Sequence, residues 1–199
     1  MMRTRTEQPI PAIVIDTREQ APLPFPAGTW ERGTLATADY SLKGYETLFG
    51  IERKSLADLL QSLTRGRGRF ERELARLAAF DFRRVLVEAP YSMVDTGRAD
   101  YWPTSRATPK SVVASIAAFE VRYGVPFVFA ASRAEAARRI RTWARYWLAE
   151  HGKGGGGTGL QRPFSGDLRR GAACPGVAAG ERPRGAITGD SGREQEHGG

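Results

Sequence analysis

The sequence predicts a single α/β domain of three layers, in which helices flank a mixed central sheet, followed by a disordered C-terminal tail. Short apolar runs alternate along the chain with stretches whose apolar residues recur at helical spacing. Two of these runs, residues 12–15 and 126–129, are apolar on both faces, as strands are when helices cover both sides of a sheet. From residue 151 the chain instead becomes rich in Gly, Arg and Pro.

Five segments are expected to form strands. They are residues 12–15, 29–38, 47–54, 84–88 and 126–129. The first strand ends at Asp16, and residues 18–26 should form a loop, because three prolines there remove backbone donors. Gly44 fits a turn ahead of the third strand.

Four stretches are expected to form helices. Their core-facing residues are Leu56, Leu59, Leu60 and Leu63; Phe70, Leu74 and Leu77; Val112, Val113, Ile116 and Phe119; and Ala136, Ile140, Trp143, Ala144 and Trp147. Each set recurs every three or four residues, which places its members on one side of a helix. Ser55 is the expected N-cap of the first helix, with Asp58 as its acidic capping partner.

The two ends of the chain differ from this core. Residues 1–10 are polar and are expected to be flexible, residues 11–150 form the domain, and residues 151–199 form the tail. The tail holds few large apolar residues, so it cannot bury enough surface to offset the entropy of ordering it. An Arg/Gly tail can contact nucleic acid, although solvated disorder is the simpler interpretation.

Charge and composition narrow the function. A net charge of +8 and a pI near 10.1 favour a polyanionic partner, since each phosphate contact releases counterions. Cys174 is the only cysteine and there are two histidines, so neither a disulfide nor a structural zinc site is expected. No apolar stretch suits a signal peptide or a membrane span. We expect a cytoplasmic, nucleoid-associated protein, and the excess of Arg over Lys indicates a bacterial or phage source.

Three charged residues have the spacing of a metal-dependent nuclease site. Asp39 follows an expected strand, and Glu52 and Lys54 end the next one, on the same face because side chains alternate along a strand. If the two strands pair as a hairpin, Asp39 comes close to Glu52, and Asp16 is a candidate third carboxylate. Carboxylates that lie close together repel one another, a bound divalent cation relieves this repulsion, and Mg²⁺ prefers oxygen ligands.

Phosphodiester hydrolysis needs these residue types. A metal ion offsets the charge of the phosphate and lowers the pKa of a water, while Lys54 would hold that water or stabilise charge developing on the phosphate. This is the PD-(D/E)xK nuclease pattern. The spacing alone favours a simpler interpretation, a solvated charged strand in an unrelated α/β protein. The charged residues 52–54, however, follow an apolar strand and lead directly into a helix, where such a cluster is costly unless it has a use.

The Arg-Gly repeat of residues 65–69, expected to be a loop, is a candidate DNA-binding segment. Arg65, Arg67 and Arg69 can form forked hydrogen bonds with phosphates, and the glycines between them let the backbone approach a DNA strand. A flexible solvated loop explains the repeat equally well by itself.

Taken together, these residues resemble the nuclease domain of the XPF-type (xeroderma pigmentosum group F) structure-specific endonucleases of the PD-(D/E)xK superfamily. The family signature reads Gly-Asp, a gap, Glu-Arg-Lys, three residues and Asp, and it is matched here by Asp39, residues 52–54 and Asp58. Further matches lie in residues 13–19, which contain an Asp-x-Arg-Glu element, and in residues 62–63, 68–70 and 76–77. The resemblance covers about residues 11–130.

The resemblance implies a restriction-endonuclease-like fold and an Mg²⁺-dependent DNA endonuclease, with Mn²⁺ able to substitute. Its substrate would be duplex DNA next to a single strand, such as a flap, fork or branched intermediate of repair or recombination. The implied catalytic residues are Asp39, Glu52, Arg53, Lys54 and Asp58, and the implied metal ligands are Asp16, Asp39 and Glu52. Among these, Arg53 and Asp58 would support the site, with Glu19 behind them.

The chain departs from the family in three places. Ala38 stands where the signature has glycine, Glu73 stands where a glutamine is common, and no tandem helix-hairpin-helix DNA-binding module is evident after residue 150. DNA binding is therefore expected to need a homodimer or a partner protein that adds contacts. These departures leave open a non-catalytic DNA-binding or scaffolding subunit on the same fold, although the intact carboxylates and lysine argue against it.

Overall fold

The structure, a computed structural model, describes residues 10–97, 102 and 107–151. The expectations for the flexible N-terminus, Ile10 apart, and for the tail lie outside these residues, except that His151 ends the last helix. No helix in the described part of the chain is long and apolar enough to cross a membrane.

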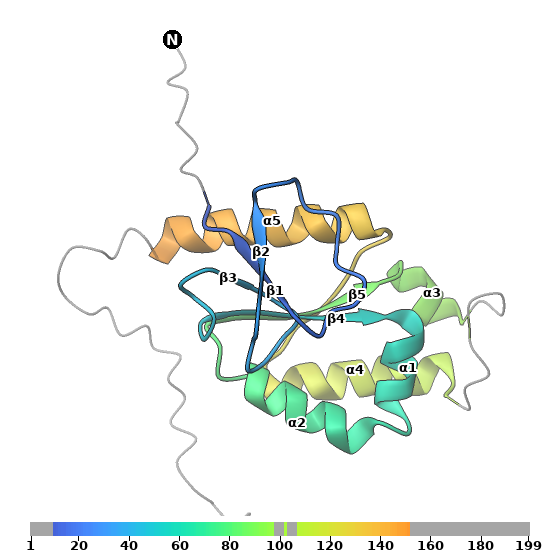
Figure 1. The fold of residues 1–199 in the computed structure, drawn as a ribbon. Helices are drawn as coiled ribbons and strands as arrows, with labels where there is room; N and C mark the ends of the chain where they lie inside the picture. The colour runs from blue at the N-terminus through green and yellow to red at the C-terminus, as the bar shows by residue number, and fades with distance from the viewer. Residues whose placement is uncertain (1–9, 98–101, 103–106, 152–199) are drawn as a thin grey trace, which may run out of the picture. The chain divides into compact units, whose positions relative to one another are not determined.

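A six-stranded mixed sheet forms the middle of the domain, in the order β2-β1-β3-β4-β5-β6 (Figure 1). Its strands are β1 Ile13–Asp16, β2 Trp30–Gly33, β3 Tyr40–Leu42, β4 Phe49–Ser55, β5 Phe82–Glu88 and β6 Phe127–Phe129. β3 runs antiparallel to both of its neighbours, whereas the β1–β2, β4–β5 and β5–β6 pairs are parallel. The hairpin expected from the sequence is therefore present, between β3 and β4.

Helices cover both faces of this sheet, which confirms the predicted three-layer α/β fold (Figure 1). The helices are α1 Leu56–Leu63, α2 Arg67–Leu77, α3 Tyr91–Thr96, α4 Pro109–Tyr123 and α5 Arg133–His151. α5 lies alone on one face, here called the α5 face. α1, α2 and α4 lie on the opposite face, here called the α1/α2/α4 face.

The core consists of two clusters, one on each face of the sheet, and they fix the direction of each strand residue. Val85 packs in the cluster of the α1/α2/α4 face, and Leu86 packs in the cluster of the α5 face. The register pairs Glu52 with Val85 and Arg53 with Leu86. Because side chains alternate along a strand, Glu52 and Lys54 point to the α1/α2/α4 face and Arg53 points to the α5 face.

The expected elements were wrong in two segments, and two further elements were not expected. The strand expected over residues 29–38 ends at Gly33, because β1, its partner, offers only four residues to pair with. The loop expected over residues 65–69 is helical from Arg67 onward. β3 and α3 were not expected, since three and six residues are too few to show a periodic pattern.

Candidate active site

Asp39 and Glu52 bring two carboxylates together at the β3–β4 hairpin. Tyr40 pairs with Ile51 in the register, so the preceding Asp39 lies opposite Glu52, and its backbone N–H donates to the Ile51 carbonyl at 3.0 Å. The backbone N–H of Arg53 donates to Asp39 Oδ2 at 2.7 Å, which fixes that carboxylate against β4. Asp39 thus precedes a strand instead of following one. It nevertheless lies close to Glu52, as predicted from the pairing of two strands as a hairpin.

The pKa values of both carboxyl groups are raised above their usual values. Burial, and then the negative charge of Glu52, raise the pKa of Asp39 to about 7. Burial also raises the pKa of Glu52, against the opposing pull of Lys54. A carboxyl that titrates near neutral pH beside a second carboxylate favours any cation that can bind both.

Lys54 lies between Glu52 and a second acidic residue, Glu73 of α2. Its Nζ is 2.8 Å from Glu52 Oε1 and 3.6 Å from Glu73 Oε2, and 5.1 Å from the centre of the Phe70 ring. Burial alone would lower the pKa of Lys54, but the neighbouring carboxylates, Glu52 first, raise it above its usual value. The lysine is therefore held as a charged ammonium although its side chain is only 14% exposed.

Asp16 lies next to Asp39 in the sheet, but its carboxylate is already engaged. It accepts hydrogen bonds from Arg18 Nε at 2.6 Å and from the backbone N–H of Leu35 at 2.7 Å, with further bonds from Arg18 Nη2 and N. Burial alone would raise the pKa of Asp16, but these bonds hold it below its usual value. Within the described residues, no three acidic, His or Cys side chains form a ready-made ligand group. A metal-binding role for Asp16 stays a prediction, and it requires Arg18 to move.

Arg53 turns away from the carboxylate pair, onto the α5 face. Its guanidinium makes a forked pair with Glu88 at 2.7 and 2.8 Å, and Nη1 donates to Glu19 Oε2 and to the Ala21 carbonyl, both at 2.9 Å. Burial alone would lower the pKa of Arg53, but these carboxylates raise it. Arg53 therefore ties the loop after β1 to β4 and β5, and it does not point into the site that Glu52 faces.

Asp58 lies at the start of α1. Its backbone N–H donates to Ser55 Oγ at 3.1 Å, and the Ser55 hydroxyl donates to Asp58 Oδ2 at 2.7 Å. The N-cap predicted at Ser55 is confirmed. Asp58 thus fixes the first turn of the helix that follows β4.

The three arginines of residues 65–69 have different surroundings. The Arg67 guanidinium lies 4.6 Å from the centre of the Phe119 ring, where it joins α2 to α4. Arg69 is 83% exposed and pairs with Glu73 at 2.9 Å. Arg65 is exposed in the turn between α1 and α2. Arg65 and Arg69 are thus exposed, whereas Arg67 is 40% exposed and also packs between the helices, and DNA contact by the three arginines stays a prediction.

Sequence reasoning missed two residues at this site, Arg18 and Glu73. Arg18, 70% exposed, is paired with Asp16, and the charges of Asp39 and Glu52 add to that pair in raising the pKa of Arg18. The two-residue spacing of Asp16 and Arg18 was a local signal for this pair. Glu73 was noted only as standing where the family commonly has glutamine, and its contact with Lys54 could not be predicted, because it depends on how α2 packs.

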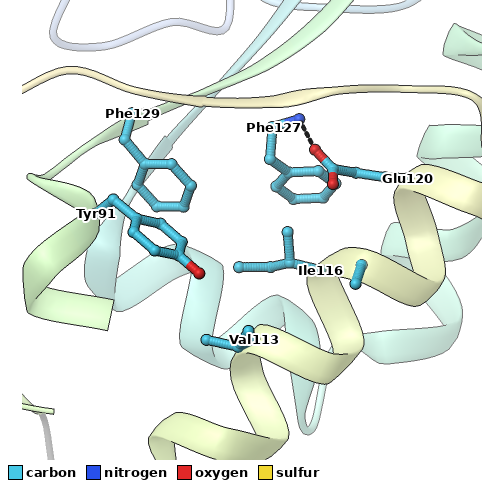
Figure 2. A pocket seen from close by; sticks show the side chains of 7 residues that line it. Tyr91, Val113, Ile116, Glu120, Phe127 and Phe129 are labelled. Carbon is cyan, nitrogen blue, oxygen red and sulfur yellow. Dashed lines mark hydrogen bonds between the residues drawn. The ribbon is translucent and has the colours of Figure 1, made fainter. Parts of the chain in front are cut away.

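A separate apolar pocket lies between α3, α4 and β6 (Figure 2). It is lined by Tyr91, Val113, Ile116, Ala117, Glu120, Phe127 and Phe129. Its charged member, Glu120, accepts a hydrogen bond from the Phe127 backbone N–H at 2.7 Å. This pocket holds none of the predicted site residues.

A mixed sheet between helices, with two carboxylates and a lysine on one side of a β-hairpin, is the arrangement of the PD-(D/E)xK class. The profile of the ERCC4 domain matches residues 15–142, more than half of the chain, and the chain belongs to the ERCC4 domain family. This membership confirms the predicted resemblance to XPF-type nuclease domains.

Two solved structures of XPF from Aeropyrum pernix share this fold. The complex with DNA is 23% identical over 70% of this chain and 66% of that one, with a TM-score of 0.54. A second XPF structure is 23% identical over 80% of this chain and 71% of that one, with a TM-score of 0.56. The chain thus spans slightly less than two thirds of the DNA-bound XPF. No curated protein sequence matches the chain.

Proposed function

We propose that the chain is a metal-dependent DNA endonuclease that hydrolyses phosphodiester bonds. The observation that carries this proposal is the pair of half-buried carboxylates, Asp39 and Glu52, beside the charged Lys54 in an ERCC4 domain. A structural ion pair needs only one carboxylate for one ammonium. A second carboxylate, whose pKa is raised to about 7, destabilises the fold unless a ligand uses it.

Asp39 and Glu52 fit a divalent cation. Both offer oxygen donors on the same face, and Mg²⁺ is typically bound by one or two carboxylates together with water and substrate phosphate, with Mn²⁺ a close substitute. When bound, such a cation supplies positive charge that offsets the charge of the phosphate and makes a water molecule more acidic. Asp16 can join this pair only if Arg18 releases it.

Lys54 supplies the charged hydrogen-bond donor of the site. Its ammonium donates to the attacking water, or to a phosphate oxygen as negative charge builds up during in-line attack. The side chain is held over Phe70, so little orientational freedom is lost when the substrate binds. Arg53 and Asp58 act through the backbone, because one anchors β4 from the α5 face and the other fixes the turn into α1.

The proposed substrate is duplex DNA next to a single strand, as in flaps, forks and branched intermediates of repair or recombination. The similar XPF from Aeropyrum pernix was solved in complex with DNA, which supports DNA as the ligand. Arg65 and Arg69 are the proposed phosphate contacts, and Arg67 is assigned to hold α2 in place. We also propose that a second copy or a partner protein adds DNA contacts, in the cytoplasm at the nucleoid.

The full chain should cleave labelled flap or fork DNA in the presence of Mg²⁺ or Mn²⁺. Lys54→Ala is expected to lower the cleavage rate about 10²- to 10³-fold, because it removes the donor that stabilises developing charge. The matched control is Lys43→Ala, which removes an exposed lysine paired with Glu31 and should leave the rate unchanged. Circular dichroism establishes that each variant is folded.

Two other outcomes would contradict the proposal. A folded wild-type chain that binds the DNA substrates but cleaves none would favour the non-catalytic DNA-binding subunit. A chain that binds neither DNA nor a divalent cation would exclude both assignments.

A further inference from the structure

Glu73 is a further carboxylate at the site, besides Asp16, Asp39 and Glu52, and no role has been assigned to it so far. Its Oε2 lies 3.6 Å from Lys54 Nζ, and its Oε1 lies 2.9 Å from Arg69 Nε. The Glu73 side chain is 19% exposed, whereas that of Arg69 is 83% exposed. Glu73 therefore links the buried ammonium to an arginine on the surface.

The closest partner of Lys54 is also a proposed metal ligand. Lys54 Nζ lies 2.8 Å from Glu52 Oε1, so the ammonium and a divalent cation compete for the same carboxylate. Once a cation engages Glu52, Lys54 must find another acceptor. Its side chain is mostly buried and packed over Phe70, and an ammonium left there without a partner is strongly unfavourable.

Glu73 is the carboxylate within reach to accept that ammonium. Of the described carboxylates it is the second in salt-bridge distance of Lys54 Nζ, and it belongs to α2, a different element from β4. We propose that Glu73 is a positioning residue that receives the Lys54 ammonium when a cation occupies Glu52, and so keeps the lysine beside the phosphate. This inference rests on the proposed function, because it takes Glu52 to be a metal ligand.

Glu71 offers a matched control on the same helix. It pairs with Arg67 at 3.3 Å and Arg122 at 3.5 Å, and it has the same charge as Glu73. Glu71→Ala therefore removes one carboxylate from α2 without removing a partner of Lys54. Any effect of Glu73→Ala that Glu71→Ala shares is an effect on the helix or on overall charge.

The first test is calorimetric titration of the full chain with Mn²⁺ alone. Glu73→Ala should weaken Mn²⁺ binding about tenfold, because Lys54 then stays on Glu52, whereas Glu71→Ala should change it less than about twofold. In a Lys54→Met background the competing ammonium is gone, so adding Glu73→Ala should change the affinity less than about threefold. If the loss is as large in that background, Glu73 acts on the cation through its own charge and the inference is wrong.

The second test is the kinetics of cleavage on a flap substrate with saturating Mn²⁺. Glu73→Ala should lower kcat about tenfold and change KM less than about twofold, because the lysine is misplaced while DNA binding is retained. Glu73→Gln keeps an acceptor oxygen and should recover part of the loss. Glu73→Met, which has no carboxylate, replaces the alanine variant in both tests if that variant does not fold. A rise in KM with kcat unchanged would assign Glu73 to DNA binding instead.

The two proposals fail in different ways. A wild-type chain that neither binds Mn²⁺ nor cleaves DNA overturns the proposed function, and the role of Glu73 with it. A wild-type chain that does both, with effects of Glu73→Ala and Lys54→Met that simply add, overturns only the role of Glu73.

Discussion

On the α5 face of β4, Arg53 meets two carboxylates, Glu19 and Glu88, and its guanidinium satisfies both with short hydrogen bonds. Glu52 and Lys54, the residues on either side of Arg53, lie on the opposite face together with the carboxylate of Asp39. There Lys54 pairs with Glu52, and the pKa of Asp39 is raised. Burial is similar on the two faces, since the side chains of Arg53 and Lys54 are both 14% exposed. Arg53 and Lys54 each face two of these carboxylates, so the difference lies in the pairing: Arg53 pairs with both Glu19 and Glu88, whereas Lys54 pairs with Glu52 and the pKa of Asp39 is raised. We call the α5 face of β4 matched and the opposite face unmatched.

The pKa values of the carboxylates report that difference. Burial alone would raise the pKa of Glu19, but hydrogen bonds from the Ala21 backbone and from Arg53 hold it below its usual value. The pKa of Asp39 is raised to about 7 by burial and by Glu52. Neighbouring residues of one triplet thus differ in role: the charges on the α5 face hold the loop after β1 to the sheet, and those on the opposite face form the proposed cation site.

Removing the ion pairs of Arg53 on the matched face should have the largest effect on stability. Arg53→Met leaves Glu19 and Glu88 mostly buried without their cationic partner, and it should lower the free energy of unfolding by about 3 kcal/mol or more. Urea denaturation at pH 7 measures this change. Lys43→Met, which breaks an exposed pair with Glu31, should cost less than about 1 kcal/mol. A stable Arg53→Met chain that has lost cleavage would instead place Arg53 in the chemistry.

Removing the charge of Asp39 from the unmatched face should raise the free energy of unfolding, by less than Arg53→Met lowers it. Because the pKa of Asp39 is about 7 in the folded chain and near 3.8 in the unfolded chain, the folded state holds an extra proton between these values. Unfolding releases that proton, so the contribution of Asp39 to the free energy of unfolding of the metal-free chain falls as pH rises from about 4 to 7 and levels off above. Asp39→Asn should reduce this slope, to which Glu52 also contributes because its pKa is raised, and should stabilise the chain by about 1 to 2 kcal/mol at pH 8.

Glu19 should show the opposite dependence of stability on pH, because its pKa is lowered where that of Asp39 is raised. Its lowered pKa gives stability that is present above about pH 4.5 and is lost only as the pH falls through the still lower folded value. Glu19→Gln should therefore destabilise the chain by a constant amount between pH 5 and 8, measured by urea denaturation with a chelator present. An Asp39→Asn variant with the same slope as the wild type would show that Asp39 is not the group responsible.

The difference between the two faces could be predicted from the sequence only where the interacting residues lie close together along the chain. The alternation of side chains along a strand was enough to place Glu52 and Lys54 on one face, and the spacing of Ser55 and Asp58 was enough to predict the N-cap. The partners of Arg53 were not predictable in this way, because the loop after β1 and the end of β5 meet only in the folded sheet. Glu73 reaches Lys54 for the same kind of reason, through the packing of α2.

The smallest expected effect concerns Ala38, the residue before Asp39. It has a φ of 74°, the only positive φ at a non-glycine residue in the described part of the chain, and it stands where the family signature has glycine. The left-handed conformation costs an alanine about 1 kcal/mol or more relative to glycine, whereas its buried methyl group contributes about 0.8 kcal/mol.

Ala38→Gly should therefore change the free energy of unfolding by less than about 1 kcal/mol, because the relieved strain offsets the lost methyl group and the added freedom of the unfolded chain. Ala38→Val, β-branched at a positive φ, should cost about 2 kcal/mol. The control is Ala118→Gly on the exposed side of α4, where the ordinary helix penalty of about 1 kcal/mol applies. If glycine costs as much at position 38 as at position 118, the turn that presents Asp39 to Glu52 is unstrained, and the unmatched face owes its instability to charge alone.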